Sequence, residues 1–180
     1  VFCAGIVNEE DSALAKKADV ALLCKGGKEE MTSTKTYVVT SLAAYILGLY
    51  LTGKWNEAAI ARLHALQRRF EDTLSSYEAW LDKGLNFLGD ITTLQIIARG
   101  PAYSTASQSA LMFKEATHIA ATGILGGEFR HGPMEMVSQG FKSILFASEG
   151  KTLEQSLKMA EDITRFGGKV WLITNAKAAL

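Results

Sequence analysis

The sequence is poor in proline and cysteine and carries no net charge. Its 180 residues include two prolines and two cysteines. Cys3 and Cys24 lack metal-ligand spacing and have no histidine nearby, so we interpret them as small buried hydrophobic residues of a reduced protein, without a disulfide framework or structural metal. The 19 basic side chains are balanced by 19 acidic ones, so the positive excess that binding to nucleic acid normally uses is missing.

Long hydrophobic runs are also missing. No apolar run approaches the roughly 18 to 20 residues of a membrane span, and residues 42–51 form only a short apolar stretch. No charged segment followed by an apolar one suggests a secretory signal peptide. We therefore expect a cytoplasmic protein with no membrane segment. The chain begins at Val1 inside a strand-like run, which predicts that it is a piece of a longer polypeptide.

What the sequence does contain is enough apolar residues, 48%, to build a substantial core. Short apolar runs at residues 2–7 and 20–24 predict buried strands, with a brief helix at 12–18. Helical spacing follows up to residue 52, with Thr32 or Ser33 as the expected N-cap and Gly53 after the C-terminus. Residues 55–87 predict one long amphipathic helix or a broken helix pair.

The second half alternates between predicted strands and predicted helices. We expect strands at 94–98, 143–147 and 168–174, helices at 104–119 and 152–166, and an irregular glycine-rich segment at 122–133. This alternation is typical of βαβ units that form a parallel sheet covered on both faces. The fold class is therefore α/β, with segments at 1–52 and 91–180 joined by a helical connector at 53–90.

Two turns could bind an anion. Thr32, Ser33, Thr34 and Lys35 begin a helix, where exposed N–H groups favour phosphate, although simple capping explains the same residues. Residues 98–104 join a strand end to a helix start, which is where open α/β sheets place ligands. A tight turn with no ligand is the alternative for this second segment, and it is slightly favoured.

Glu115 and His131 are the candidates for proton transfer. Glu115 lies on an otherwise apolar predicted helix, and His131 precedes a Gly-Pro pair after a glycine-rich stretch. A carboxylate and an imidazole in such places suit general base and acid catalysis. The alternative is that Glu115 forms a surface ion pair with Lys114 or Lys16 and that His131 is an ordinary loop histidine.

Several stretches together resemble the tandem sugar isomerase (SIS) domain family, which includes the isomerase half of glucosamine-6-phosphate synthase and related deaminases and deglycases. The stretches from the second domain of that family are Ala98-Arg99-Gly100-Pro101-Ala102-Tyr103, Ser109-Ala110-Leu111-Met112-Phe113-Lys114-Glu115, His118-Ile119-Ala120 and Gly127-Glu128-Phe129-Arg130-His131-Gly132-Pro133. The stretches from its first domain are Ala18-Asp19-Val20-Ala21-Leu22 and residues 27–37.

The resemblance implies a doubly wound, flavodoxin-like α/β/α sandwich around a five-stranded parallel sheet. Residues 1–52 would then be the later part of one SIS domain and residues 91–180 the earlier part of the next. Phosphate-binding loops of the first domain would lie upstream of Val1, and the synthase's C-terminal tail beyond Leu180. The family also implies a homodimer or higher homo-oligomer with shared active sites and no cofactor.

By resemblance, Glu115 is the carboxylate that moves a proton between C1 and C2 of a sugar phosphate. His131 matches the ring-opening histidine that a neighbouring subunit contributes, and Met31 and Ser33 match positions that contact the sugar. Two departures are Met112, in place of a lysine near the sugar hydroxyls, and Gln108, in place of a glutamate.

The expected function is a phosphosugar isomerase or an aminosugar-phosphate deaminase or deglycase, acting on a hexose 6-phosphate derivative without a metal. The two departures weigh against aminosugar synthesis. The alternative is a non-catalytic protein that binds a sugar phosphate and regulates a partner.

Overall fold

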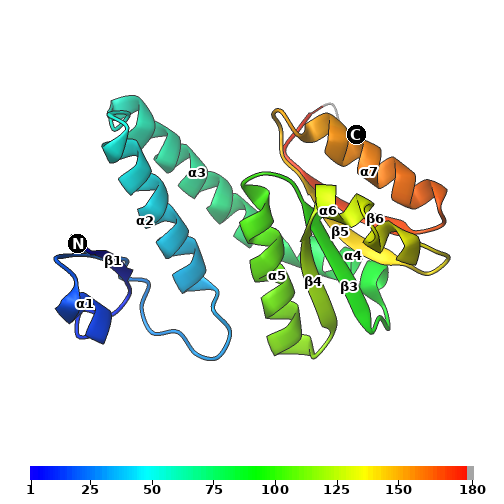
Figure 1. The fold of residues 1–180 in the computed structure, drawn as a ribbon, viewed down its shortest axis with the longest axis horizontal. Helices are drawn as coiled ribbons and strands as arrows, with labels where there is room; N and C mark the ends of the chain where they lie inside the picture. Colours follow the sequence, from blue (N-terminus) through cyan, green and yellow to red (C-terminus); the bar gives the residue numbers. More distant parts are fainter. Residues whose placement is uncertain (178–180) are drawn as a thin grey trace. The chain divides into compact units, whose positions relative to one another are not determined.

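The structure, a computed structural model, describes residues 1–177 and divides the chain into two compact units, Val1–Trp80 and Leu81–Leu180 (Figure 1). Each unit is described by itself. The predicted segments 1–52, 53–90 and 91–180 remain predictions, and residues 178–180 of the last one lie outside the described residues.

The first unit opens with two short parallel strands, β1 (Ala4–Val7) and β2 (Val20–Leu23), paired in register from Ala4 and Val20. Helix α1 (Ala13–Lys17) connects them and begins at Ser12, whose hydroxyl accepts a hydrogen bond from the N–H of Ala15 at 3.2 Å. Both predicted strands are present, with shorter limits, but β2 has no buried residue, so the expectation of a buried strand is wrong there. Cys3 is exposed, so the expectation that it is buried is wrong for this residue, which precedes β1.

Three helices follow: α2 (Lys35–Leu51), α3 (Glu57–Ser75) and α4 (Tyr77–Leu88). The N-cap of α2 is Thr34, so the prediction of Thr32 or Ser33 is wrong. Gly53 follows α2 with a φ of 65°, a left-handed conformation that glycine adopts without strain. The connector is a broken helix pair, and α3 begins at Asn56, whose side chain accepts from the N–H of Ala59 at 3.0 Å.

The second unit contains a four-stranded parallel sheet in the order β4-β3-β5-β6. Its strands are β3 (Thr93–Ala98), β4 (Ala120–Leu125), β5 (Lys142–Ala147) and β6 (Lys169–Thr174). Helix α5 (Ala102–Thr117) joins β3 to β4, and α7 (Leu153–Arg165) joins β5 to β6. This arrangement confirms the parallel α/β fold.

The segment 122–133 is regular, contrary to the expectation. It contains most of β4, helix α6 (Gly126–Arg130) and the start of the short 3-10 helix η1 (Pro133–Met136). Glycine usually weakens a strand, but at Gly123 an added Cβ would lie 2.6 Å from Cα of Ser107 on α5. The glycine is therefore required by close packing of the helix against the strand.

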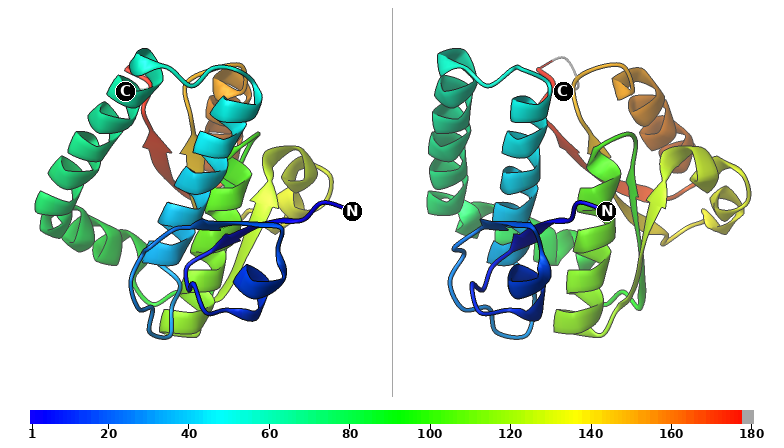
Figure 2. Two further views of the ribbon diagram at one scale, coloured as in Figure 1. Left: turned by 90° about the vertical axis from the view of Figure 1, so that its left-hand side faces the viewer. Right: turned by 60° about the vertical axis from the view of Figure 1, so that its left-hand side comes forward.

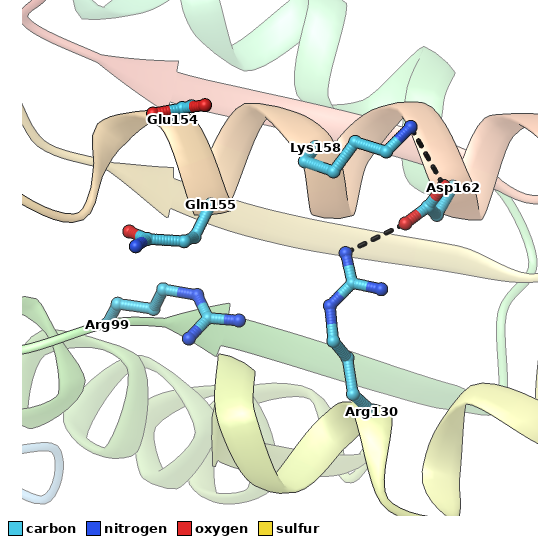
Figure 3. A pocket seen from close by; sticks show the side chains of 6 residues that line it. All are labelled: Arg99, Arg130, Glu154, Gln155, Lys158 and Asp162. Atoms are coloured by element: carbon cyan, nitrogen blue, oxygen red, sulfur yellow. Dashed lines mark hydrogen bonds and ion pairs between the residues drawn. The ribbon is translucent and has the colours of Figure 1, made fainter.

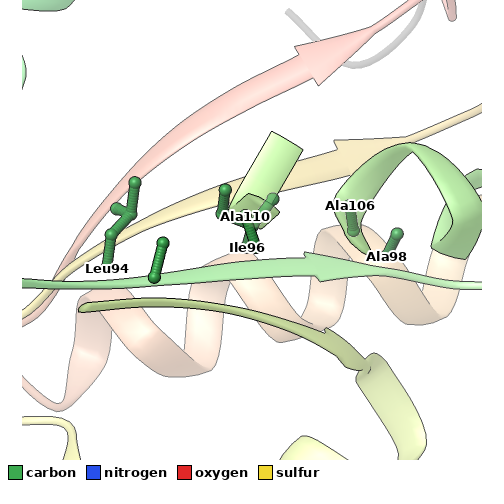
Figure 4. Close-up of a cluster of buried hydrophobic side chains, with 6 residues drawn as sticks. Leu94, Ile96, Ala98, Ala106 and Ala110 are labelled. Atoms are coloured by element: carbon green, nitrogen blue, oxygen red, sulfur yellow. The ribbon is translucent and has the colours of Figure 1, made fainter. Parts of the chain in front are cut away.

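The core of the second unit lies on both faces of the sheet. On one face, Leu94, Ile96, Ala98, Ala106, Ala110 and Ala121 are buried together beneath α5 (Figure 4). On the other face, a second buried cluster packs beneath α6 and α7: Ile97, Phe129, Leu145, Ala147, Met159 and Ile163. Ile96 and Ile97 point to opposite faces because side chains alternate along a strand. Two views in Figure 2 show the helices on either side of the strands.

Candidate functional site

Glu115 lies near the C-terminal end of α5, five residues after the buried Ala110. Its side chain is half-buried, and its Oε2 atom is buried without a hydrogen-bond partner. Lys16, the suggested surface partner, pairs instead with Asp11 at 3.3 Å. A buried carboxylate oxygen with no donor is unfavourable unless a ligand or proton satisfies it. The surface ion-pair alternative is therefore not supported for Lys16.

His131 is the C-cap of α6 and is exposed. Its backbone N–H donates to the carbonyl oxygen of Glu128 at 2.9 Å, and the next residue, Gly132, has a φ of 138°. Such a φ strongly favours glycine, and Pro133 then starts η1. The local sequence thus builds a sharp turn that leaves the imidazole accessible from outside the chain.

Met31 and Ser33 lie in the first unit, in the loop before α2, whereas Glu115 and His131 lie in the second unit. The side chain of Met31 is 76% exposed. Ser33 is half-buried, and its hydroxyl lies 2.7 Å from that of Thr36. The roles assigned by resemblance to all four residues remain predictions.

The start of α2 already holds a carboxylate. Glu29 accepts a hydrogen bond from the backbone N–H of Thr36 at 2.7 Å and further bonds from the hydroxyls of Thr36 and Thr34. The bonds from Thr36 are the main reason that the pKa of Glu29 falls to about 2. Glu29 therefore caps the helix from a position that spacing around Thr32 and Ser33 did not indicate, and it occupies the N–H of Thr36.

The two departures from the family pattern, Met112 and Gln108, share a helix with Glu115. They precede it by three and seven residues, so all three lie on one side of α5. Both side chains are half-buried. At this spacing, Met112 and Gln108 can affect the surroundings of the Glu115 carboxylate.

A second polar cluster lies on the other face of the sheet, in a cavity of about 470 Å³ (Figure 3). Its lining residues are Arg99, Arg130, Glu154, Gln155, Lys158 and Asp162, and we call it the arginine pocket. The sequence indicated only the turn that contains Arg99. The other five were missed. Four of them lie on 152–166, where polar and charged residues at helical spacing are usual on a solvated face.

The arginine pocket is lined by more basic than acidic side chains. The buried carboxylate of Asp162 lies 2.8 Å from Arg130, 3.4 Å from Lys158 and 3.2 Å from Arg165. The hydrogen bond from Arg130 is the largest cause that lowers the pKa of Asp162 below its usual value. Burial, and then the charge of Arg130, lower the pKa of Arg99.

No helix within residues 1–177 is long and apolar enough to cross a membrane. Over the same residues, no group of three or more histidine, cysteine, aspartate or glutamate side chains is arranged to hold a metal ion.

A family model described as SIS domain matches residues 88–179. Over 182 aligned residues the chain is 25% identical to a glutamine–fructose-6-phosphate aminotransferase (isomerizing) of Rhizobium meliloti, covering 97% of this chain and 30% of that protein. The chain thus spans less than a third of the length of this curated relative.

Solved structures show the same fold. The C-terminal domain of glucosamine-fructose-6-phosphate aminotransferase from Francisella tularensis superposes with a TM-score of 0.83 at 24% identity, covering 95% of this chain and 50% of that one. A glucosamine-6-phosphate deaminase from Thermotoga maritima gives a TM-score of 0.71 at 20% identity, covering 96% and 52%.

Proposed function

This chain belongs to the SIS domain family, and we propose that it contributes to an enzyme that moves a proton between C1 and C2 of a phosphorylated hexose or aminosugar. The observation that carries the proposal is the buried Oε2 atom of Glu115, which has no hydrogen-bond partner. A carboxylate in this condition is ready to accept a proton from a carbon acid. The similarity to an isomerizing aminotransferase supports the substrate class.

In the proposed reaction, Glu115 removes the proton from one of the two carbons and returns it to the other. Removal of the first proton leaves the sugar as an enediol intermediate, on which the negative charge develops. His131, exposed on its turn, opens the sugar ring by proton transfer to the ring oxygen in the site of a neighbouring subunit. Met31 and Ser33 contact the sugar. The chain's own residues thus supply a base and a proton donor.

Proton exchange with deuterated water tests the role of Glu115. The full-length protein should exchange a C1 proton of fructose 6-phosphate or the C2 proton of glucosamine 6-phosphate. Glu115→Gln keeps the shape of the side chain but removes the base, so exchange should fall by about 10² to 10⁴ with binding little changed. Glu78→Gln, at an exposed glutamate on α4, is the matched control. Exchange retained by a folded Glu115→Gln protein would contradict the assignment.

Mixing of two inactive variants tests the shared site. In dimers that combine Glu115→Gln with His131→Ala subunits, one of the two sites contains both intact residues. Random exchange should therefore restore about a quarter of the wild-type activity, since half of the dimers are mixed. No recovery after proven subunit exchange would place both residues in one chain's site or make His131 structural.

Met112 bears on the choice of substrate. An apolar, unbranched side chain cannot hydrogen-bond a sugar hydroxyl, so we infer a preference for an amine-linked sugar phosphate over plain fructose 6-phosphate. Met112→Lys should shift the ratio of kcat/KM for these substrates toward fructose 6-phosphate. An unchanged ratio would show that position 112 does not face the substrate. Binding of every hexose phosphate with no exchange would instead favour the regulatory, non-catalytic alternative.

A further inference from the structure

The arginine pocket lies at the point where the winding of the sheet changes direction. From β3 the chain passes through α5 to β4 on one side, and from β5 it passes through α7 to β6 on the other. The neighbouring strands β3 and β5 therefore send their following helices to opposite faces. Open α/β sheets bind ligands in the crevice at the carboxyl ends of such strands. Arg99 directly follows β3, and Glu154 and Gln155 lie in the first turn of α7 after β5.

Arg99 is held over the start of α6. A Cβ added at Gly126 would lie 2.9 Å from its Nε atom, so the glycine leaves the space that the guanidinium occupies. The Nε atom is buried and has no hydrogen-bond partner. Among residues 1–177, no carboxylate lies within 4.0 Å of this guanidinium. Arg99 thus has an unsatisfied donor and an uncompensated charge, both of which an anion would satisfy.

Two more cations line the same cavity. Arg130 and Lys158 both pair with Asp162, which also serves Arg165, so one carboxylate is shared by three basic side chains. In Figure 3, Arg99 and Gln155 lie at one end of the cavity, and Arg130 and Lys158 lie at the other. Counting the lining residues, three positive charges meet two negative ones, of which Glu154 forms no ion pair within residues 1–177.

We propose that the arginine pocket binds the phosphate group of a small phosphorylated metabolite, with Arg99, Arg130 and Lys158 as its cationic contacts. A phosphate monoester carries about −1.5 to −2 charges at pH 7 and offers three acceptor oxygens. That charge relieves the repulsion between two guanidiniums better than the single charge of a carboxylate does. A cavity of about 470 Å³ has the size of a small-ligand site. The pocket lies on the face of the sheet opposite α5 and Glu115, and none of its lining residues has a part in the proposed reaction.

Calorimetric titration of the full-length protein with inorganic phosphate tests the proposal. Arg99→Gln should weaken binding about tenfold, the usual loss for a hydrogen bond to a charged group. Lys158→Gln should weaken it about threefold, and its exposed side chain makes misfolding no concern. Glu154→Gln removes a negative charge from the lining and should tighten binding about twofold. Lys151→Gln, an exposed lysine before α7 outside the lining, is the matched control.

Opposite signs for Glu154→Gln and Arg99→Gln are the decisive result. Binding that keeps its affinity in Arg99→Gln and Lys158→Gln, or that falls equally in Lys151→Gln, would overturn the proposal, as would no binding at all. Acetate should bind at least tenfold more weakly than phosphate, and equal affinities would overturn the assignment to a phosphate group. None of these measurements depends on turnover, so failure here leaves proton transfer by Glu115 unaffected.

Discussion

The two faces of the four-stranded sheet are packed by different means. Beneath α5 the buried helix residues are small, Ala106 and Ala110, and Gly123 lets the helix backbone approach the strand. Beneath α6 and α7 the contacts are large side chains, with Phe129 and Met159 both fully buried. Backbone approach therefore fixes the position of α5, whereas side-chain volume sets the position of α7.

The two faces of the sheet also carry the two proposed sites. The helix that carries Glu115 packs closely against the sheet, and this close packing fixes the position of the carboxylate. On the opposite face, the pocket beyond the end of β3 is lined by polar and charged side chains instead of apolar ones. The proposed base and the proposed anion pocket thus occupy opposite faces of one sheet.

The largest effect should come from removing volume beneath α6 and α7. Phe129 is fully buried and lies with its ring centroid 6.2 Å from that of Phe141. Phe129→Ala should lower the free energy of unfolding by about 3 to 5 kcal/mol, measured by urea denaturation. The matched change beneath α5, Ala106→Gly, removes little volume and should cost about 1 kcal/mol through helix propensity. Equal losses of unfolding free energy in the two variants would contradict the contrast between the faces.

The next effect comes from adding volume beneath α5. A Cβ at position 123 would lie 2.6 Å from the backbone of Ser107, so Gly123→Ala should push α5 away and cost about 1 to 3 kcal/mol. Because α5 carries Glu115, proton exchange by the folded variant should also fall. Gly127→Ala is the control, since its nearest atom is the flexible end of Arg99 at 4.0 Å. A variant with normal exchange would show that α5 need not be held so closely.

Sequence patterns located the elements whose apolar residues follow a regular spacing. The runs at 94–98 and 143–147 correspond to β3 and β5, and helical spacing at 104–119 and 152–166 corresponds to α5 and α7. The patterns failed at Gly123, where glycine is present for contact with a distant helix and weakens the strand pattern. They also failed at Glu29, whose capping bond to Thr36 spans seven positions.

The candidate site divides in the same way. Glu115 and His131 could be named because a carboxylate on an apolar helix and a histidine before Gly-Pro are unusual locally. The arginine pocket could not be assembled from sequence, because Arg99, Arg130 and Asp162 come from three elements that only the winding of the sheet brings together. Spacing along the chain does not indicate that these three elements come together in the fold.

A smaller effect should follow acidification. The hydrogen bond from Arg130 is the main cause that lowers the pKa of Asp162, so this group stabilises the folded state above its unfolded pKa of about 3.9. That contribution is lost as the pH falls below about 4 through the folded pKa. Asp162→Asn should reduce stability by about 1 to 2 kcal/mol at pH 6 and much less at pH 3. Glu161→Gln, with a side chain 68% exposed, should change the acid dependence far less.

The smallest effect on stability should come from Lys158, and it separates packing from binding on the α7 face. Its side chain is 57% exposed and pairs with Asp162 at helical spacing, a kind of pair that contributes little to stability. Asp162 keeps Arg130 and Arg165 when Lys158 is removed. Lys158→Gln should therefore leave the free energy of unfolding almost unchanged while weakening phosphate binding about threefold. Paired urea denaturation and calorimetry measure both quantities. A clear loss of stability would make Lys158 a structural member of the Asp162 network, so that its effect on phosphate could not be attributed to direct contact.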